Sequence, residues 1–145
     1  MADRNNIRIG RVSSVDYTNG MIRVTFPDRD GAVSSLLPVL SLNGEYKMPQ
    51  VGENVLVAML SNGTGAGIVL GSYWNLSNKP PVSGAGHYRK DFGKSPGTAY
   101  MDYDAVSGTL TIHARRIVID GDNRIDVIAP TLYNSNYWAR DREGS

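Results

Sequence analysis

The sequence predicts an all-β fold, and three observations carry that prediction. Good surface-helix formers are scarce, with three Glu and four Lys, whereas chain-turning residues are plentiful, with 16 Gly and 7 Pro. We find no capped window of about 12 residues, free of Gly and Pro, whose apolar positions follow the helical spacing i, i+3, i+4, i+7. Instead, short apolar alternations bounded by turn residues recur along the chain.

Length and composition exclude several classes of protein. The chain has 145 residues, which predicts one domain or two small ones. Its formal charge of +1 offers no general field for nucleic acid. The absence of Cys excludes disulfides, thiolate zinc sites and cysteine nucleophiles. No apolar run approaches the roughly 18 residues that cross a bilayer, and the polar start shows no secretory signal, so we expect synthesis in a cytoplasm.

Residues 1–75 predict a small barrel. The Asn19-Gly20 pair predicts a tight hairpin turn, and Gly10 predicts a bulge or bend in the first strand. Residues 55–60 form a near-continuous apolar run, which favours a strand buried on both faces. Closing such strands into a barrel removes the sheet edges that would otherwise aggregate. The five expected strands are 7–17, 21–26, 33–40, 55–60 and 67–73.

The chain changes character after the barrel. Residues 76–97 are rich in Gly and Pro and predict a linker with a short strand at 87–92. Residues 98–130 then alternate in short strands at 99–104, 109–113, 116–120 and 124–128. Each of these strands offers one apolar face about two side chains wide, and some 30 residues of this kind cannot cover their own core. We therefore expect identical chains to supply the remaining core side chains. The predicted shared core comprises Leu110, Ile112, Ile117, Ile119, Ile125 and Val127.

Three motifs in the first half resemble a known family when taken together. Residues 9–12 and 20–28 read Ile-Gly-Arg-Val and Gly-Met-Ile-Arg-Val-Thr-Phe-Pro-Asp. Residues 48–57 contain the pattern Pro-x-x-Gly-Glu-x-Val, and residues 67–75 read Gly-Ile-Val-Leu-Gly-Ser-Tyr-Trp-Asn. In this order and spacing they resemble the opening hairpin, strand entry and closing strand of the phage baseplate assembly protein V family.

That resemblance implies an architecture and a role. The family has an oligonucleotide/oligosaccharide-binding-type barrel (OB-fold) that forms a trimeric collar, followed by a needle, a β-helix wound from three chains. It forms the central spike of contractile injection machines, in phage tails, tailocins and, through related valine-glycine repeat spikes, type VI secretion. The implied chain is a homotrimeric structural protein of a virion or tailocin baseplate. Its partners would be a hub protein above the barrel, possibly a separate tip protein, and the target cell envelope that it pierces.

The chain departs from fuller members of that family at two points. It has no room for the lysozyme-like insertion that some spikes carry after the barrel. Other spikes end in a His-x-His pair whose three copies bind iron, whereas residues 112–115 here read Ile-His-Ala-Arg, with one His. We therefore expect no metal at the tip, no other cofactor and no enzymatic activity.

Other candidate motifs favour structural interpretations. His113 is expected to face solvent from a strand, and His87 to lie in a linker loop. Asp102 and Asp104 share a strand face and predict a solvated edge rather than a glycosidase pair. Residues 63–67, Gly-Thr-Gly-Ala-Gly, join two strands and lack the Gly-Lys-Ser/Thr ending of a phosphate loop, so they predict a turn.

The alternative function is an OB-fold module that binds single-stranded nucleic acid or an oligosaccharide. Such a module needs a basic groove with aromatic side chains on which bases stack. Aromatic residues are available, but the barrel's Arg8, Arg11 and Arg23 are countered by acidic residues, so we expect no nucleic-acid partner. The aromatic residues are Tyr17, Phe26, Tyr46, Tyr73 and Trp74, and the acidic ones are Asp3, Asp16, Asp28 and Asp30.

Residues 131–145 form a tail of different character. The alternation stops at Ala129-Pro130, because proline cannot donate to a strand ladder. The following residues carry Leu132, Tyr133, Tyr137 and Trp138, and three exposed copies of such a cluster would be adhesive. We expect the tail either to fold back on the shaft or to dock a separate tip protein.

Overall fold

The computed structural model describes residues 6–60, 65–133 and 135, and within them the fold is all-β with no α-helix. A 3-10 turn at Pro27–Arg29 follows the second strand. None of the described residues belongs to a helix that is long and apolar enough to span a membrane. The all-β prediction is confirmed for these residues.

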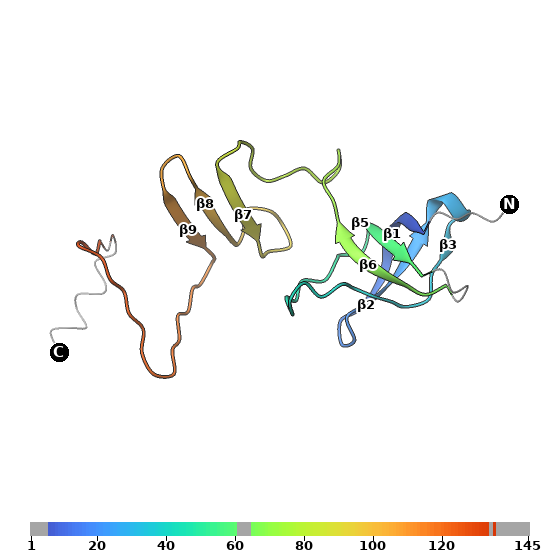
Figure 1. Cartoon of the computed structure of the whole chain (residues 1–145), viewed down its shortest axis with the longest axis horizontal. Coiled ribbons are helices and arrows are strands. Elements are labelled where there is room, and N and C mark those ends of the chain that lie inside the picture. The colour runs from blue at the N-terminus through green and yellow to red at the C-terminus, as the bar shows by residue number, and fades with distance from the viewer. Residues whose placement is uncertain (1–5, 61–64, 134, 136–145) are drawn as a thin grey trace. The chain divides into compact units, whose positions relative to one another are not determined.

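The first part of the chain is a closed barrel (Figure 1). Its strand order is β3-β2-β1-β5-β6, with β4 also pairing β2. A parallel bridge between Val39 and Val69 closes the barrel, and the Leu40 N–H donates to the Val69 carbonyl at 2.8 Å. The strands are β1 (Ile7–Asp16), β2 (Met21–Phe26), β3 (Ala32–Val33), β4 (Leu37–Pro38), β5 (Asn54–Met59) and β6 (Gly67–Ser72).

The β1–β2 hairpin forms where the sequence predicts it. Gly20 has φ 66°, a left-handed conformation that glycine adopts without steric cost. The Asp16 carboxylate accepts hydrogen bonds from the Asn19 side-chain amide at 2.9 Å and the Asn19 N–H at 3.2 Å. The side-chain bond from Asn19 is the largest of the effects that lower the pKa of Asp16.

The barrel core comes from alternate residues of the paired strands. Packed against it is the backbone of Gly10, where a Cβ atom would lie 2.0 Å from Cγ1 of Val24. Only glycine permits that approach. The buried side chains are Val12, Ile22, Val24, Phe26, Leu37, Val55, Val57 and Val69.

Two local predictions for the barrel are wrong. Gly10 pairs regularly with Val55, and the bulge lies instead between Val12 and Ser14. Gly10 therefore allows close packing of the backbone and does not mark a bulge. The expected strand 33–40 is split into β3 and β4, because the Ser34 hydroxyl, rather than a strand carbonyl, accepts the Val24 N–H at 2.9 Å.

The prediction that 55–60 is buried on both faces is also corrected in the single chain. Val55 and Val57 are fully buried in the barrel, whereas Leu56 and Ala58 on the outer side are half-buried. The expected glycine turn at 63–67 lies partly outside the described residues, and β6 begins at its last residue, Gly67. Strand β5 thus has an apolar outer side that the barrel itself does not cover.

A second, three-stranded sheet follows the barrel, and its first strand lies within the predicted linker 76–97 (Figure 1). Its order is β7-β8-β9, and both pairs are antiparallel. The predicted short strand at 87–92 and the strands at 99–104 and 109–113 are confirmed to within a residue. Their observed bounds are β7 (His87–Asp91), β8 (Tyr100–Asp104) and β9 (Thr109–His113).

The chain divides into two units after His113. In the second unit, the described residues 114–133 and 135 contain no strand, so the strands expected at 116–120 and 124–128 are absent from the single chain. A strand requires a hydrogen-bonded neighbour, and this stretch has none within its own unit. The boundaries at 75, 97 and 130 stay predictions, and the tail at 131–145 lies mostly outside the described residues.

Candidate assembly interface

The second sheet has two chemically different faces. Residues directly opposite in an antiparallel ladder share a face, so the register assigns each side chain to one of the two faces of the sheet. The first face carries Tyr88, Lys90, Met101, Tyr103, Leu110 and Ile112. The opposite face carries His87, Arg89, Asp91, Tyr100, Asp102, Asp104, Thr109, Thr111 and His113.

Side chains on the polar face are paired with one another. His87 Nδ1 lies 3.2 Å from Asp102 Oδ1, and Arg89 Nε donates to Asp91 Oδ1 at 3.1 Å. The Arg89 guanidinium also lies 3.8 Å from the centre of the Tyr100 ring, a cation–π contact. Several polar groups on this face therefore find their interaction partners within one chain.

These contacts correct the expectations for His87 and Asp102, whereas His113 is exposed on β9 as expected. His87 lies in β7 rather than in a loop, and its ring contacts Asp102, which is therefore not merely a solvated edge. The His113 ring lies 5.2 Å, centre to centre, from that of Tyr100.

Asp104 holds the turn between β8 and β9. Its carboxylate accepts hydrogen bonds from the Val106 N–H at 3.0 Å and the Ser107 hydroxyl at 3.1 Å. The backbone hydrogen bond from Val106 is the largest of the effects that lower the pKa of Asp104. Gly108 completes the turn with φ 69°. Asp104 thus holds the turn from the solvated position that was expected for it.

The apolar face is uncovered in the single chain. Tyr103 is 42% exposed and Leu110, opposite it, is 58% exposed. Tyr88 and Ile112 on the same face are also exposed. Apolar side chains gathered on one sheet face are a feature of interaction surfaces rather than of ordinary monomer surfaces. We call the set Tyr88, Met101, Tyr103, Leu110 and Ile112 the bare face.

The structure brings together two of the six residues predicted to form a trimer core. Leu110 and Ile112 lie side by side on the bare face. All four of the others belong to the second unit, where each is exposed, with Ile119 at 71%. Near them, Arg124 Nε donates to Asp126 Oδ1 at 2.8 Å. Those four remaining residues are Ile117, Ile119, Ile125 and Val127.

A polar bracket, formed by Glu45, Lys47 and Gln50, joins the barrel to the second sheet, and no sequence pattern predicts it. Lys47 Nζ donates to the Asp91 carbonyl at 2.5 Å, and Gln50 Nε2 donates to the Lys94 carbonyl at 3.3 Å. Glu45 forms an ion pair with Lys90. The loop expected merely to connect two strands therefore anchors the end of β7, the first strand of the second sheet.

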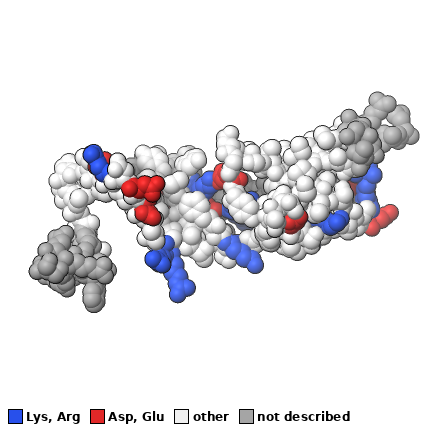
Figure 2. Space-filling view, turned by 90° about the horizontal axis from the view of Figure 1, so that it is seen from below, with Lys and Arg blue, Asp and Glu red and all other residues white. Residues whose placement is uncertain are grey.

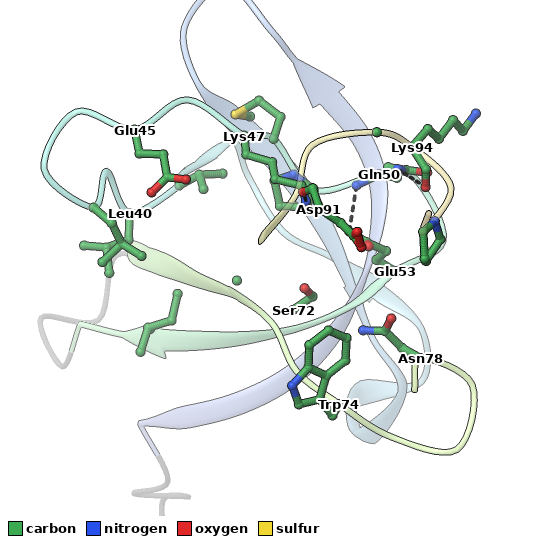
Figure 3. A pocket seen from close by; sticks show the side chains of 18 of the residues that line it. Leu40, Glu45, Lys47, Gln50, Glu53, Ser72, Trp74, Asn78, Asp91 and Lys94 are labelled. Carbon is green, nitrogen blue, oxygen red and sulfur yellow. Dashed lines mark hydrogen bonds between the residues drawn. The ribbon is translucent and has the colours of Figure 1, made fainter. Parts of the chain in front are cut away.

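A hollow of about 380 Å³ lies beside this bracket (Figure 3). Trp74 and Leu40 contribute apolar walls from either side of β6, while Ser72 and Asn78 add polar groups. Glu53 borders it, but its carboxylate is engaged by the Gln50 N–H at 2.9 Å. Much of the polar rim is thus committed to holding the loop in place.

The described part of the barrel carries charges of both signs, and several of its arginines make contacts within the chain. Lys and Arg are interspersed with Asp and Glu on the face seen in Figure 2. Arg11 Nε donates to the Gly52 carbonyl at 3.0 Å, and Arg23 Nη1 to the Ser34 carbonyl at 3.2 Å. Arg8 lies 5.8 Å from the centre of the Phe26 ring, which is itself buried. The described residues also contain no cluster of three or more His, Asp or Glu that could hold a metal ion.

Comparison with known proteins relates the barrel to a family. Residues 8–74 match the family model described as the type VI secretion system/phage-baseplate injector OB domain. These bounds span the six barrel strands from the second residue of β1 to just beyond β6. No curated protein matches the chain. Over residues 8–74 the barrel of this chain is therefore similar to the injector OB domain of phage baseplates and type VI secretion systems.

Proposed function

We propose that this chain is the homotrimeric central spike of a contractile tail baseplate, in a phage or a tailocin, with a mechanical rather than an enzymatic role. The injector OB domain supports a place in a baseplate or secretion spike. In the proposal, three copies wind residues 98–130 into a β-helical needle. Sheath contraction then drives this needle through the target cell envelope.

The bare face is the observation that carries the proposal. Its side chains lie opposite a polar face that is already paired within the chain. An isolated sheet of three short strands with one uncovered apolar face is unstable in water, so it needs a covering layer. Two further copies supply such layers at the same height along a shared axis, and the apolar residues then fill a common interior.

The edge of the sheet supports the same assembly. Strand β9 pairs with β8 on one side, and the described residues supply no strand for its other side. An open edge presents unpaired N–H and C=O groups that invite another strand. The strands expected at 116–120 and 124–128 lack partners in the single chain. Pairing between copies would give hydrogen-bond partners both to the open edge of β9 and to these two segments. A closed β-helix of this kind would transmit axial load through its hydrogen-bonded backbone.

The partners follow from the proposed place in the machine. The barrel collar would meet a baseplate hub protein, and the needle end would carry a separate tip protein or the folded tail. The protein would be made in the host cytoplasm and assembled into the tail. Interspersed charge and the internal engagement of Arg11 and Arg23 weigh against the nucleic-acid alternative.

Labelling of intact particles tests this function. A chain carrying an affinity tag should be found by gold-labelled electron microscopy on the central axis of the baseplate. Cells in which this chain is replaced by the Ile119→Asp variant should yield no particles that kill or infect. Tagged particles without axial label, or salt-sensitive binding of single-stranded DNA by the purified chain, would contradict the proposal in favour of the binding module.

A further inference from the structure

The loop that leads from β4 to β5 is fixed to the barrel at its end. The Gly52 N–H donates to the Val12 carbonyl and the Val12 N–H to the Glu53 carbonyl, both at 2.9 Å. Arg11 Nε also donates to the Gly52 carbonyl at 3.0 Å. The Glu53 carboxylate in turn accepts the Gln50 N–H at 2.9 Å. These hydrogen bonds hold the end of the loop against β1.

The same loop reaches the second sheet through the polar bracket. The three bracket side chains meet β7 and the turn after it in the same order along both segments. A single contact would leave the two segments free to rotate about it, whereas three contacts at different positions oppose that rotation. The contacts are Glu45 with Lys90, Lys47 with the Asp91 carbonyl, and Gln50 with the Lys94 carbonyl.

Gln50 joins the two sets of contacts. Its N–H is bonded to Glu53, which is itself bonded to β1, and its side chain is bonded to the Lys94 carbonyl (Figure 3). A continuous series of hydrogen bonds thus runs from Val12 in the barrel to the turn after β7. The covalent connection between the same two parts is different in kind, because residues 79–86 contain no strand and are rich in Pro and Gly.

We propose that residues 45–53 are a strut, a segment that fixes the second sheet to the barrel so that the two move as one body, while residues 76–86 only connect them. The barrel and the second sheet belong to the same compact unit of the chain, which agrees with such a coupling. A connection that lacks hydrogen-bonded backbone and contains Gly leaves the parts that it joins free to reorient. The strut therefore supplies the fixed orientation that the connection cannot supply.

This inference concerns a single chain and does not depend on the proposed trimer. In the proposed spike it has a mechanical consequence. Axial force on the barrel reaches the needle through the strut as well as through residues 76–86, and without the strut those residues would bend first.

The absence of cysteine allows a distance measurement within the full chain. Val33→Cys and Val106→Cys place one spin label on β3 and another in the turn between β8 and β9, where both native side chains are exposed. The labelled chain is refolded together with an excess of unlabelled chain, so that each assembly carries at most one labelled copy. Double electron–electron resonance then gives the distribution of distances between the barrel and the second sheet of one chain.

Removal of two bracket donors should broaden that distribution. Lys47→Met combined with Gln50→Met deletes both donors and keeps the length of each side chain, and neither residue belongs to the barrel core. We expect the width of the distribution to double at least. Lys79→Met is the matched control, because Lys79 is also exposed but lies outside the strut, and it should keep the wild-type width.

A Gly-Ser insertion after Ser83 tests the covalent connection separately, and we expect it to leave the wild-type width unchanged. A distribution that keeps its width when the two donors are removed, or that broadens as much on the insertion, would overturn the strut. A wild-type chain that is monomeric would instead refute the proposed spike and leave the strut standing, because both labels lie in one chain.

Discussion

Tyr103 and Leu110 lie opposite each other in the β8–β9 ladder, and both side chains remain exposed in the single chain. On the other side of the same strands, Tyr100 packs under the Arg89 guanidinium and against the His113 ring. The two sides of one small sheet thus differ in how fully they are satisfied. That asymmetry is the basis for assigning the bare face to assembly.

Substitution of Ile119 tests the predicted needle core. Ile119→Ala removes one side chain from each of three copies, and each loss costs roughly 2–5 kcal/mol if the side chain is fully packed. The Ile119→Asp variant should not assemble, because three carboxylates would meet in an apolar interior. Sedimentation velocity of the purified variants measures the assembly directly.

Val106→Asp is the matched control for that experiment. Val106 is 91% exposed and lies in the turn between β8 and β9, outside the alternating stripe. Its variant should assemble like the wild type. A trimer of Ile119→Asp with an unchanged melting temperature would show that the facing assigned to residues 116–120 is wrong.

Gly10→Ala tests the close packing of the barrel. The added Cβ would lie 2.0 Å from Val24 Cγ1 and 3.2 Å from Phe26 Cδ1, both in the core. Overpacking of this kind costs about 1–3 kcal/mol of the free energy of unfolding, measured by chemical denaturation. Gly86→Ala is the control, since its Cβ would meet nothing nearer than 3.4 Å. Equal stability of the two variants would mean that the barrel relaxes freely around position 10.

Asp104→Ala should produce a loss of stability that depends on pH. The pKa of Asp104 is lowered from its usual 3.8 in the folded chain, chiefly by the Val106 N–H. A lowered folded pKa contributes stability that is fully present above 3.8 and is lost as the pH falls through the folded value. The variant should therefore melt below the wild type at pH 7 and approach it at pH 2. A melting difference that is the same at both pH values would argue against an ionised Asp104 as the stabilising group.

Deletion of residues 131–145 tests the role of the tail. The chain lacking it should remain a soluble trimer, because the predicted core residues end at Val127. Particles that carry it should lose tip attachment or killing activity. Failure of the shortened chain to trimerise would show that the tail belongs to the shaft's own core, whereas fully active particles would remove both proposed roles.

Local patterns predicted much of the barrel. Asn19-Gly20 located the first hairpin, although its loop spans residues 17–20 and takes a positive φ at Gly20 and not at Asn19. The motifs in residues 9–28, 48–57 and 67–75 together pointed to the family whose OB-domain model matches residues 8–74. The patterns could not predict that the Ser34 hydroxyl, rather than a strand carbonyl, accepts the hydrogen bond of the Val24 N–H. Which acceptor is used depends on how the two segments pair in the folded barrel.

The candidate interface was predictable only in part, for a physical reason. Alternation predicted that Leu110 and Ile112 share one face of the sheet. It could not predict the contact of His87 with Asp102, because that contact depends on the register between β7 and β8. The polar bracket at Lys47 and Gln50 uses backbone carbonyls as acceptors, and those leave no trace in side-chain composition. Strands expected at 116–120 and 124–128 require neighbours that a single chain does not provide.

Solution mass tests the central claim most directly. Multi-angle light scattering on the purified full chain at micromolar concentration should give three times the chain mass of 15.8 kDa. That value should persist at high salt, because apolar burial rather than surface charge holds the assembly together. A mass of 15.8 kDa under the same conditions would contradict the proposed trimeric spike.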